Sequence, residues 1–196
     1  MRSGPAASLD RPLLPGDGPA MQRVLMLPGF GGGADQSILV HLEEALRRRG
    51  LSALRASLTG GRPSVALEDE VQQARALRRS DPDISAYAGR SFGGRVLARL
   101  ALDESPRALL LLGFPVRSAA GRRRPDDERA LTALSCPTLI VQGSRDPLGP
   151  IRTLERLVAS NPRLELVVLR GAGHSFGRQE KTALETAADW LARRLS

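Results

Sequence analysis

Gly89-Arg90-Ser91-Phe92-Gly93-Gly94 joins a short apolar run, Ile84 to Ala88, to a helical run, Arg95 to Leu102. The hexapeptide contains the pattern Gly-x-Ser-x-Gly in a setting where a strand ends, the chain turns sharply and a helix begins. A Cβ atom at its first or fifth position would clash where the turn brings the two backbones together, so glycine suits both. The serine between them would point its hydroxyl out of the turn, which makes Ser91 a candidate nucleophile. An ordinary tight turn satisfies the same short pattern, so its meaning depends on the rest of the chain.

Two later segments supply the partners that a serine nucleophile needs, in the chain order expected of such a site. Asp146 follows the apolar run 138–142, and His174 follows the apolar run 164–169. An imidazole can take the proton of a hydroxyl near neutral pH, and a carboxylate can hold that imidazole in the right tautomer. Ser91, Asp146 and His174 are therefore the predicted catalytic residues. As alternatives, Asp146 could start the helix after Pro147, and His174 could be a loop residue without a role.

Backbone amides at two places are candidates for stabilising a developing oxyanion. The amide of Phe92 opens the helix after Ser91, where the helix dipole is positive. The second candidate is the amide of Phe30, or that of Gly31, in the glycine-rich segment 28–33 that follows the apolar run 22–27. Glycines let a backbone approach a ligand closely, although a mobile turn would explain them equally well.

The four phenylalanines of the chain each lie within two residues of a motif or of a predicted strand end. Core packing alone would scatter them along strands and helices. We therefore expect them to line an apolar substrate pocket for an acyl or aryl group, with ordinary core packing as the alternative. The four residues are Phe30, Phe92, Phe114 and Phe176.

Composition favours one globular domain. The chain has 196 residues, of which 41% are apolar, and this length suits a single core without a large lid. Residues 1–20 contain four prolines among small and charged residues, so we expect a flexible N-terminal leader before a domain at 21–196. No apolar run has the length of a membrane span or of a signal peptide. With the single Cys136, which excludes an internal disulfide, these features predict a cytoplasmic protein without a membrane partner.

The formal charge of +8 raises the question of a nucleic-acid partner. Arginine runs occur at 47–49 and 122–124, but they fall in different predicted elements and lack interleaved aromatic residues. We expect no specific nucleic-acid binding, only weak adhesion to polyanions. The arginine-rich segment 117–124 stands where a rim or short cap would lie, and it could bind an anionic part of a substrate or simply be solvated. His41 has no partners at metal-ligand spacing, and no motif calls for a cofactor.

Strand and helix patterns alternate along the whole chain. Such alternation predicts a mostly parallel sheet of about six or more strands with helices on both faces, and it places the motifs above at the carboxyl ends of strands, where ligands bind in such sheets. The predicted strands are 22–27, 51–56, 84–88, 107–114, 137–142 and 164–169, and the predicted helices are 35–49, 65–79, 95–102, 126–134, 151–160 and 178–195.

Taken together, these motifs resemble those of the alpha/beta-hydrolase superfamily. They look most like the small dienelactone-hydrolase-like predicted hydrolases that include the testis-expressed hydrolase-like proteins of animals. The resemblance covers most of residues 21–195 and implies Ser91 as nucleophile, His174 as base and Asp146 as the residue that orients His174. The matching segments are residues 27–33 followed by Asp35, then 89–94, 113–115, 142–146 and 173–176.

The sequence departs from these relatives at two places. Many of them open the oxyanion loop with His-Gly, whereas this chain has Pro28-Gly29, and dienelactone hydrolases proper use a cysteine where this chain has Ser91. The second departure argues against that named activity. The function predicted is a serine hydrolase that cleaves a small carboxylic ester or thioester through an acyl-enzyme, without a cofactor. The alternative is a non-catalytic interaction module that keeps the hydrolase fold.

Overall fold

A six-stranded parallel sheet is the centre of the chain, seen in a computed structural model that describes residues 22–59 and 66–196. The order of the strands is β2-β1-β3-β4-β5-β6, and every neighbouring pair is parallel. The predicted leader, residues 1–20, lies outside the described residues. The strands are β1 (Arg23–Leu27), β2 (Ser52–Arg55), β3 (Ile84–Arg90), β4 (Ala108–Leu112), β5 (Thr138–Gly143) and β6 (Leu164–Leu169).

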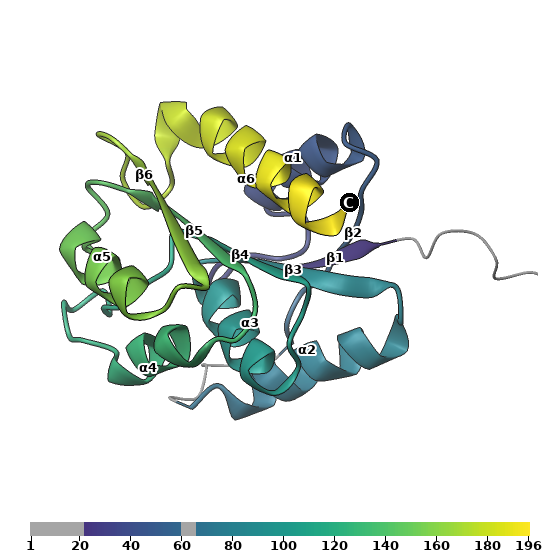
Figure 1. The fold of residues 1–196 in the computed structure, drawn as a ribbon, viewed down its shortest axis with the longest axis horizontal. Coiled ribbons are helices and arrows are strands. Elements are labelled where there is room, and N and C mark those ends of the chain that lie inside the picture. Colours follow the sequence, from purple (N-terminus) through teal and green to yellow (C-terminus); the bar gives the residue numbers. More distant parts are fainter. Residues whose placement is uncertain (1–21, 60–65) are drawn as a thin grey trace, which may run out of the picture.

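Helices cover both faces of the sheet (Figure 1). On one face lie α1 and α6, which pack beside each other, and on the other face lie α2, α3, α4 and α5. The bounds are α1 (Ser37–Arg47), α2 (Glu68–Ser80), α3 (Phe92–Asp103), α4 (Pro125–Ala133), α5 (Ile151–Ser160) and α6 (Glu180–Leu195), which follows a 3-10 turn, η1 (Gly177–Gln179).

The strand order explains which helix covers which face. The chain steps from β1 to β2 in one direction along the sheet and from β3 to β6 in the other. Since connections between parallel strands are right-handed, this reversal sends α1 to one face and α2, α3, α4 and α5, which connect the later strands, to the opposite one. The loops that leave the neighbouring strands β1 and β3 therefore run to opposite faces of the sheet. The space between these two loops is the switch point at which ligands bind in open α/β sheets.

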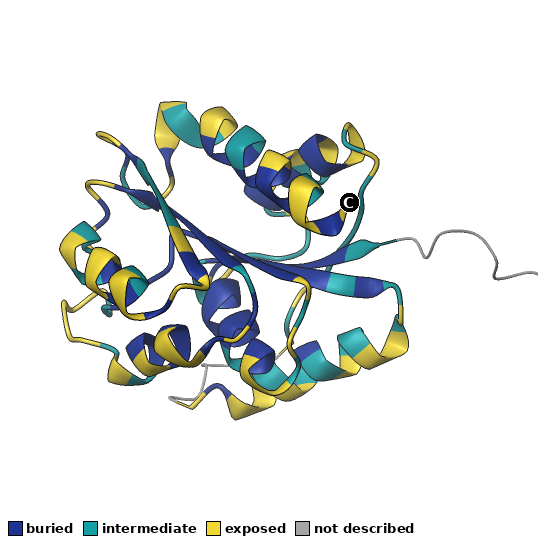
Figure 2. Cartoon of the chain, in the orientation of Figure 1, coloured by how far each residue is buried: buried dark blue, intermediate teal, exposed yellow. Residues whose placement is uncertain are grey.

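Apolar side chains fill the space between the sheet and each helix layer. All five residues of β4 are buried, as expected of a central strand covered on both faces. Figure 2 shows the central strands as the buried layer, while the edge strands β2 and β6 are partly exposed and the outer sides of the helices are exposed. The predicted fold class is confirmed, and no lid domain is inserted within the described residues.

The element ends differ from the predicted ones where the backbone takes a positive φ. Leu67 has φ 62° directly before α2, so that helix starts at Glu68, while the predicted start at Val65 lies outside the described residues. Phe176 has φ 60°, and the predicted last helix therefore begins as the short turn η1. Both residues lie in the left-handed region, which a regular helix does not contain.

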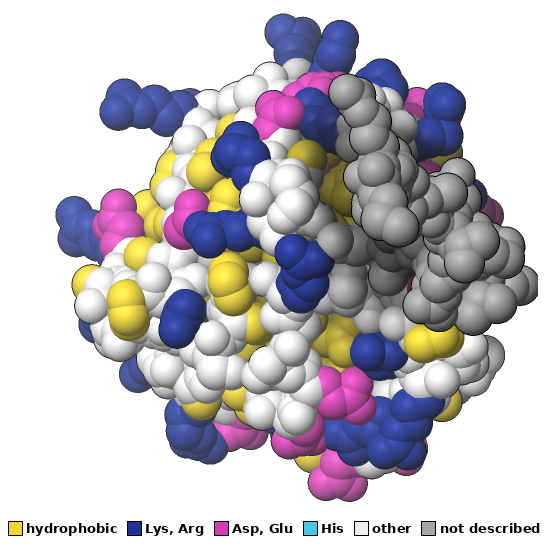
Figure 3. All heavy atoms as spheres, turned by 45° about the vertical axis from the view of Figure 1, so that its right-hand side comes forward, with side chains coloured by type: hydrophobic (Ala, Val, Ile, Leu, Met, Phe, Trp, Pro, Cys, Tyr) yellow, Lys and Arg dark blue, Asp and Glu magenta, His cyan; other side chains and the backbone are white. Residues whose placement is uncertain are grey.

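Many arginines pair with nearby carboxylates. Arg48 contacts Glu185 at 2.5 Å and Arg49 contacts Asp189 at 2.7 Å, so part of the run 47–49 ties α1 to α6. On the face in Figure 3, Lys and Arg side chains are spread out and interspersed with Asp and Glu. The absence of specific nucleic-acid binding stays a prediction. No helix of the described chain has both the length and the apolar character that a membrane crossing requires.

Candidate active site

The turn between β3 and α3 holds Ser91 in a strained backbone conformation. Its φ and ψ are 47° and −104°, whereas the helix that it precedes starts at Phe92. A Cβ on Gly89 would overlap the backbone of Gly94, and one on Gly93 would lie 2.5 Å from the carbonyl oxygen of Leu27. Both contacts are impossible, so the two glycines are needed as the sequence pattern predicts. Strain of this kind is characteristic of residues held in place for a function.

Ser91, His174 and Asp146 form one continuous chain of hydrogen-bonding groups. Nε2 of His174 lies 2.9 Å from Oγ of Ser91, and Nδ1 of His174 lies 2.7 Å from Oδ2 of Asp146. The three residues follow β3, β6 and β5, which end at the same edge of the sheet. The fold thus brings together residues that are up to 83 positions apart in the sequence.

Asp146 is held firmly by its surroundings. Its side chain is fully buried, and besides His174 it accepts hydrogen bonds from the backbone amide of Leu148 at 2.9 Å and from Nε2 of Gln142 at 2.6 Å. Buried carboxylates need such donors because they have left water. The alternative that Asp146 starts the next helix is wrong, because α5 begins at Ile151 after Pro150 and has no side-chain cap; the bond from the Leu148 amide stays within the turn. Gln142 is a site residue that the sequence did not single out, since one glutamine in an apolar strand carries no pattern.

Arg90 anchors the loop that carries His174. The side chain is only 7% exposed, and it donates to the carbonyl oxygens of Leu112 at 3.0 Å and of His174 itself at 2.7 Å. Its guanidinium also lies over the ring of Phe176. Burial lowers the pKa of Arg90, while the negative charges of Asp146 and Glu180 oppose this shift. The variable position of the Gly-x-Ser-x-Gly pattern therefore has a positioning role that the pattern alone did not predict.

The glycine-rich loop after β1 lies against the start of α3. The amide of Gly29 donates to Oε1 of Gln36 at 2.9 Å, and the carbonyl of Pro28 accepts from the amide of Gly93 at 2.9 Å. These bonds fix the loop beside Ser91. The amides of Phe30 and Phe92, the two predicted oxyanion donors, make no hydrogen bond to any other described residue. Both are therefore available to a ligand, and their role as donors remains a prediction.

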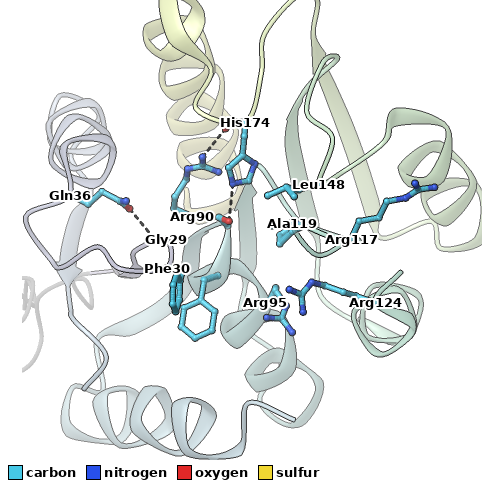
Figure 4. A pocket seen from close by; sticks show the side chains of 13 residues that line it. Gly29, Phe30, Gln36, Arg90, Arg95, Arg117, Ala119, Arg124, Leu148 and His174 are labelled. Carbon is cyan, nitrogen blue, oxygen red and sulfur yellow. Dashed lines mark hydrogen bonds between the residues drawn. The ribbon is translucent and has the colours of Figure 1, made fainter. Parts of the chain in front are cut away.

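A cavity of about 740 Å³ opens beside Ser91 and His174 (Figure 4). Phe30, 71% exposed, meets Phe92 edge to face with the ring centroids 6.0 Å apart, and both rings line the cavity. The opposite wall comes from the segment after β4, which includes the predicted rim. Its lining residues are Pro115, Arg117, Ala119 and Arg124.

The prediction that all four phenylalanines line the pocket is wrong for two of them. Phe114 is completely buried and Phe176 is 1% exposed, and each belongs to one of the two hydrophobic cores on opposite faces of the sheet. Neither lines the cavity. Position next to a motif does not fix the direction of a side chain, because neighbouring residues of a loop can point into the core or into the site.

His41, the second histidine, lies on α1 away from the cavity. Its Nδ1 is 2.9 Å from a carboxylate oxygen of Glu180 on α6, so the ring makes a surface contact. Within residues 22–59 and 66–196, no group of three or more His, Cys, Asp and Glu side chains is placed to hold a metal ion.

A strand-turn-helix elbow with a linked serine, histidine and aspartate defines the class of hydrolases built on an α/β sheet. The family model of the alpha/beta hydrolase domain matches residues 62–194 of this chain. The chain therefore belongs to the alpha/beta hydrolase family.

A curated relative and several solved structures are similar to this chain. An uncharacterized protein of Mycobacterium tuberculosis (strain ATCC 25618 / H37Rv) is 32% identical over 187 residues, which cover 82% of this chain and 64% of the relative. The chain thus spans less than two thirds of the length of this curated relative. Est1E from Butyrivibrio proteoclasticus has a TM-score of 0.75 at 18% identity, covering 92% of this chain and 91% of that one. An alpha-beta serine hydrolase homologue from Coxiella burnetii has a TM-score of 0.68 at 25% identity, covering 91% and 86%.

Dienelactone hydrolase from Anabaena variabilis is a further structural neighbour. It has a TM-score of 0.70 at 22% identity, and the match covers 90% of this chain and 86% of that one. This likeness and the one to Est1E show the shared fold. The predicted membership of the alpha/beta-hydrolase superfamily is confirmed by the family model.

Proposed function

We propose that the protein is a serine hydrolase that cleaves a small carboxylic ester or thioester. The observation that carries the proposal is the chain of contacts from Asp146 through His174 to Ser91, at 2.7 Å and 2.9 Å. Hydrogen-bond distances of this kind are what proton transfer between a hydroxyl and an imidazole requires. The strained backbone at Ser91 and the likeness to the alpha-beta serine hydrolase homologue from Coxiella burnetii support the proposal.

In the first half of the reaction, Oγ of Ser91 attacks the acyl carbon of the substrate. Nε2 of His174 takes the hydroxyl proton as the new C–O bond forms, and Asp146 stabilises the resulting imidazolium. When the tetrahedral intermediate collapses, the bond to the leaving group breaks, and His174 gives its proton to the departing alcohol or thiol. The product of this half is an ester of Ser91 with the acyl group.

In the second half, water releases the acyl group. His174 takes a proton from the water molecule as its oxygen attacks the acyl carbon, and it returns the proton to Oγ of Ser91 when the acyl-enzyme breaks. The amides of Phe92 and Phe30 would donate to the oxyanion in both halves. The dipole of α3, whose first residue is Phe92, adds to that stabilisation.

The cavity favours small substrates with an apolar part. The edge-to-face pair of Phe30 and Phe92 offers one apolar wall next to Ser91. A short acyl chain or an aryl ring would bury apolar surface against these rings. We expect 4-nitrophenyl butyrate to be cleaved with a higher kcat/KM than the acetate ester, and no gain for butyrate would argue against this wall as the acyl site.

A non-catalytic interaction module is the competing hypothesis. A module that had lost its chemistry would gain nothing from a strained serine or from a buried carboxylate that must be supplied with donors. The direct test is the hydrolysis of 4-nitrophenyl esters by the wild type, by Ser91→Ala and by Ser175→Ala. Ser175 is the matched control because it is exposed, follows His174 directly and does not line the cavity.

We expect Ser91→Ala to lower kcat/KM by about 10³-fold or more, as in other serine hydrolases that lose their nucleophile. Ser175→Ala should stay within about twofold of the wild type, since surface substitutions disturb little. Equal rates for the wild type and Ser91→Ala would overturn the proposal and leave the interaction module.

A further inference from the structure

Two of the four arginines that line the cavity, Arg95 and Arg124, lie close together although they come from different parts of the chain. Arg95 lies in the first turn of α3, one turn beyond Ser91, and Arg124 directly precedes α4. Figure 4 shows their side chains pointing toward one another, whereas the guanidinium of Arg117 points away. The side chain of Arg95 is only 9% exposed, so this positive charge belongs to the cavity wall and not to the outer surface.

The negative charge beside these arginines is too small to balance them. Asp127, which is 1% exposed, accepts from Nε of Arg95 at 2.7 Å and from Nη2 of Arg99 at 3.1 Å. The single negative charge of Asp127 is therefore shared by the positive charges of Arg95 and Arg99, and Arg124 adds a third positive charge nearby. Arg123, the neighbour of Arg124, pairs instead with Glu128 at 2.7 Å.

The side chain of Arg124 forms no hydrogen bond and no ion pair with another described residue. Its Nε is buried. Burial lowers the pKa of this guanidinium and the adjacent charge of Arg95 lowers it further, while the charge of Asp127, already shared by Arg95 and Arg99, opposes both effects. An unpaired cation held in a partly desolvated place costs free energy unless a ligand supplies the missing charge.

The position of Arg95 in its helix also favours an anionic ligand. A positive side chain in the first turn of a helix is repelled by the positive end of the helix dipole, and α3 has no acidic residue in that turn. Three positive features, the two guanidinium groups and the start of α3, thus converge on one side of the cavity. Guanidinium groups bind carboxylate and phosphate oxygens through paired hydrogen bonds.

We propose that Arg95 and Arg124 form a subsite for an anionic oxygen group of the substrate, a carboxylate or a phosphate. On this inference, which rests on the proposed function, the ester or thioester cleaved at Ser91 carries such a group in its acyl part or in its leaving group. The subsite selects acidic substrates, and the rings of Phe30 and Phe92 contact their apolar part.

The test compares anionic esters with neutral esters of nearly the same shape. For the leaving group, the set is 4-acetoxybenzoate, 4-acetoxyphenyl phosphate and the neutral 4-acetoxybenzamide. For the acyl part, the pair is 4-nitrophenyl hydrogen adipate and its terminal amide. The measured quantity is the ratio of kcat/KM between an anionic ester and its neutral counterpart, at fixed ionic strength because exposed charges are screened by salt.

The variants are Arg124→Gln and its matched control Arg122→Gln. Both remove one positive charge from the same segment, but Arg122 is exposed and does not line the cavity. We expect the wild type to prefer an anionic ester by about tenfold or more in at least one set, a ratio typical of a hydrogen bond to a charged group. Arg124→Gln should remove most of that preference, and Arg122→Gln should keep it. Arg124→Lys, which retains the charge, should keep part of it, and this variant serves if Arg124→Gln does not fold.

Two results would overturn the subsite while leaving the proposed function intact. One is turnover of all the esters with ratios near one in both sets. The other is an equal loss of preference in Arg122→Gln and Arg124→Gln, which would assign the preference to the overall net charge. A larger ratio for the phosphate or for the carboxylate identifies which anion the subsite takes.

A binding measurement separates the subsite from the chemistry. With Ser91→Ala, titration of 4-acetoxybenzoate and 4-acetoxybenzamide followed by calorimetry reports recognition without turnover. Tighter binding of the carboxylate that disappears in the Ser91→Ala/Arg124→Gln double variant supports the subsite even if no ester is cleaved, in which case the proposed function alone fails. Equal binding of both compounds, together with an absence of turnover, would overturn both.

Discussion

The two ends of the sheet each carry a cavity and a buried titratable side chain, yet they are built differently. At the carboxyl ends of the strands, His174 stands between Ser91 and Asp146 with short contacts on both sides. At the amino ends, a second cavity of about 530 Å³ is lined by Tyr87 and Glu104, whose side-chain oxygens are 3.4 Å apart. Only the first arrangement links a serine, a histidine and a carboxylate, the three groups for which we propose the roles of nucleophile, base and orienting residue.

The two ends of the sheet also differ in backbone conformation. The carboxyl end contains Ser91 at φ 47° and two glycines that tolerate no side chain, while the strand that contains Tyr87 has no positive φ and only a register shift near its start. Backbone strain of the kind seen at Ser91 is maintained where a side chain has to be aimed at a ligand. The comparison teaches that a cavity with a buried titratable group does not by itself make an active site. The substitutions below test the contrast in order of falling effect on activity.

The largest effect is expected for Asp146→Asn. The asparagine amide can present a donor to Nδ1 of His174, which favours the wrong tautomer of the imidazole, and losses of roughly 10⁴-fold in kcat are known for this change in serine proteases. Ester hydrolysis measures it. Asp83→Asn, near the amino ends of the strands, is the control and should stay near the wild-type rate. A loss below about tenfold for Asp146→Asn would remove Asp146 from the triad.

A smaller loss is expected for Arg90→Met. The methionine cannot donate to the carbonyl oxygens of His174 and Leu112, so the histidine loop loses its anchor. A displacement of about 1 Å can cost about 10²-fold in rate, and we expect kcat to fall by about ten- to a hundredfold with KM nearly unchanged. Arg90→Lys should recover part of the loss. A lower melting temperature with an unchanged kcat would show that Arg90 only stabilises the fold.

The smallest effect on activity is expected at the amino end, for Tyr87→Phe. This residue does not contact the triad, and its replacement should leave kcat/KM within about twofold. Burial, helped by the charge of Glu104, raises the pKa of Tyr87 to about 12. Because Tyr87 is the only tyrosine of the chain, the absorbance change of the phenolate near 295 nm follows it directly.

The sign of the accompanying change in stability follows from the same shift. The unfolded tyrosine loses its proton near pH 10 and the folded one near 12. The free energy of unfolding therefore falls as the pH rises from about 10 to about 12. The contribution of the protonated Tyr87 to stability is complete below pH 10 and is lost as the pH rises through 12. Tyr87→Phe should lose less stability over this interval, and a phenolate signal centred near pH 10 in the folded protein would contradict the shift.

Much of the fold and the identity of the candidate triad could be predicted from the sequence. Runs such as Leu164–Leu169 and Ile151–Ser160 carry their own periodicity, and both match the observed bounds. The elbow could be predicted because the contact that requires its glycine, between Gly89 and the backbone of Gly94, joins residues close in sequence. Ser91, Asp146 and His174 could be proposed because each follows a strand whose carboxyl end has to lie at the same edge.

What the sequence could not supply depends on side-chain direction and on contacts between distant elements. Phe114 and Phe176 lie beside motifs but point into the core, and no local pattern distinguishes them from Phe30 and Phe92. The same limit applied to the arginines. The sequence predicts a possible rim at 117–124. That Arg124 lies beside Arg95 depends on how α4 packs against α3, which no local pattern shows.

The central claim is that Ser91 alone among the serines is activated by His174, and labelling with a fluorophosphonate measures this directly. Oγ of an activated serine attacks the phosphorus atom, the P–F bond breaks and fluoride leaves, so the protein gains the mass of one phosphonyl group. Peptide mapping by mass spectrometry should find a single adduct on the peptide that contains Ser91, absent in Ser91→Ala and strongly reduced in His174→Ala. An unlabelled wild type, or an adduct on another serine such as Ser85 at the opposite end of the sheet, would contradict the account.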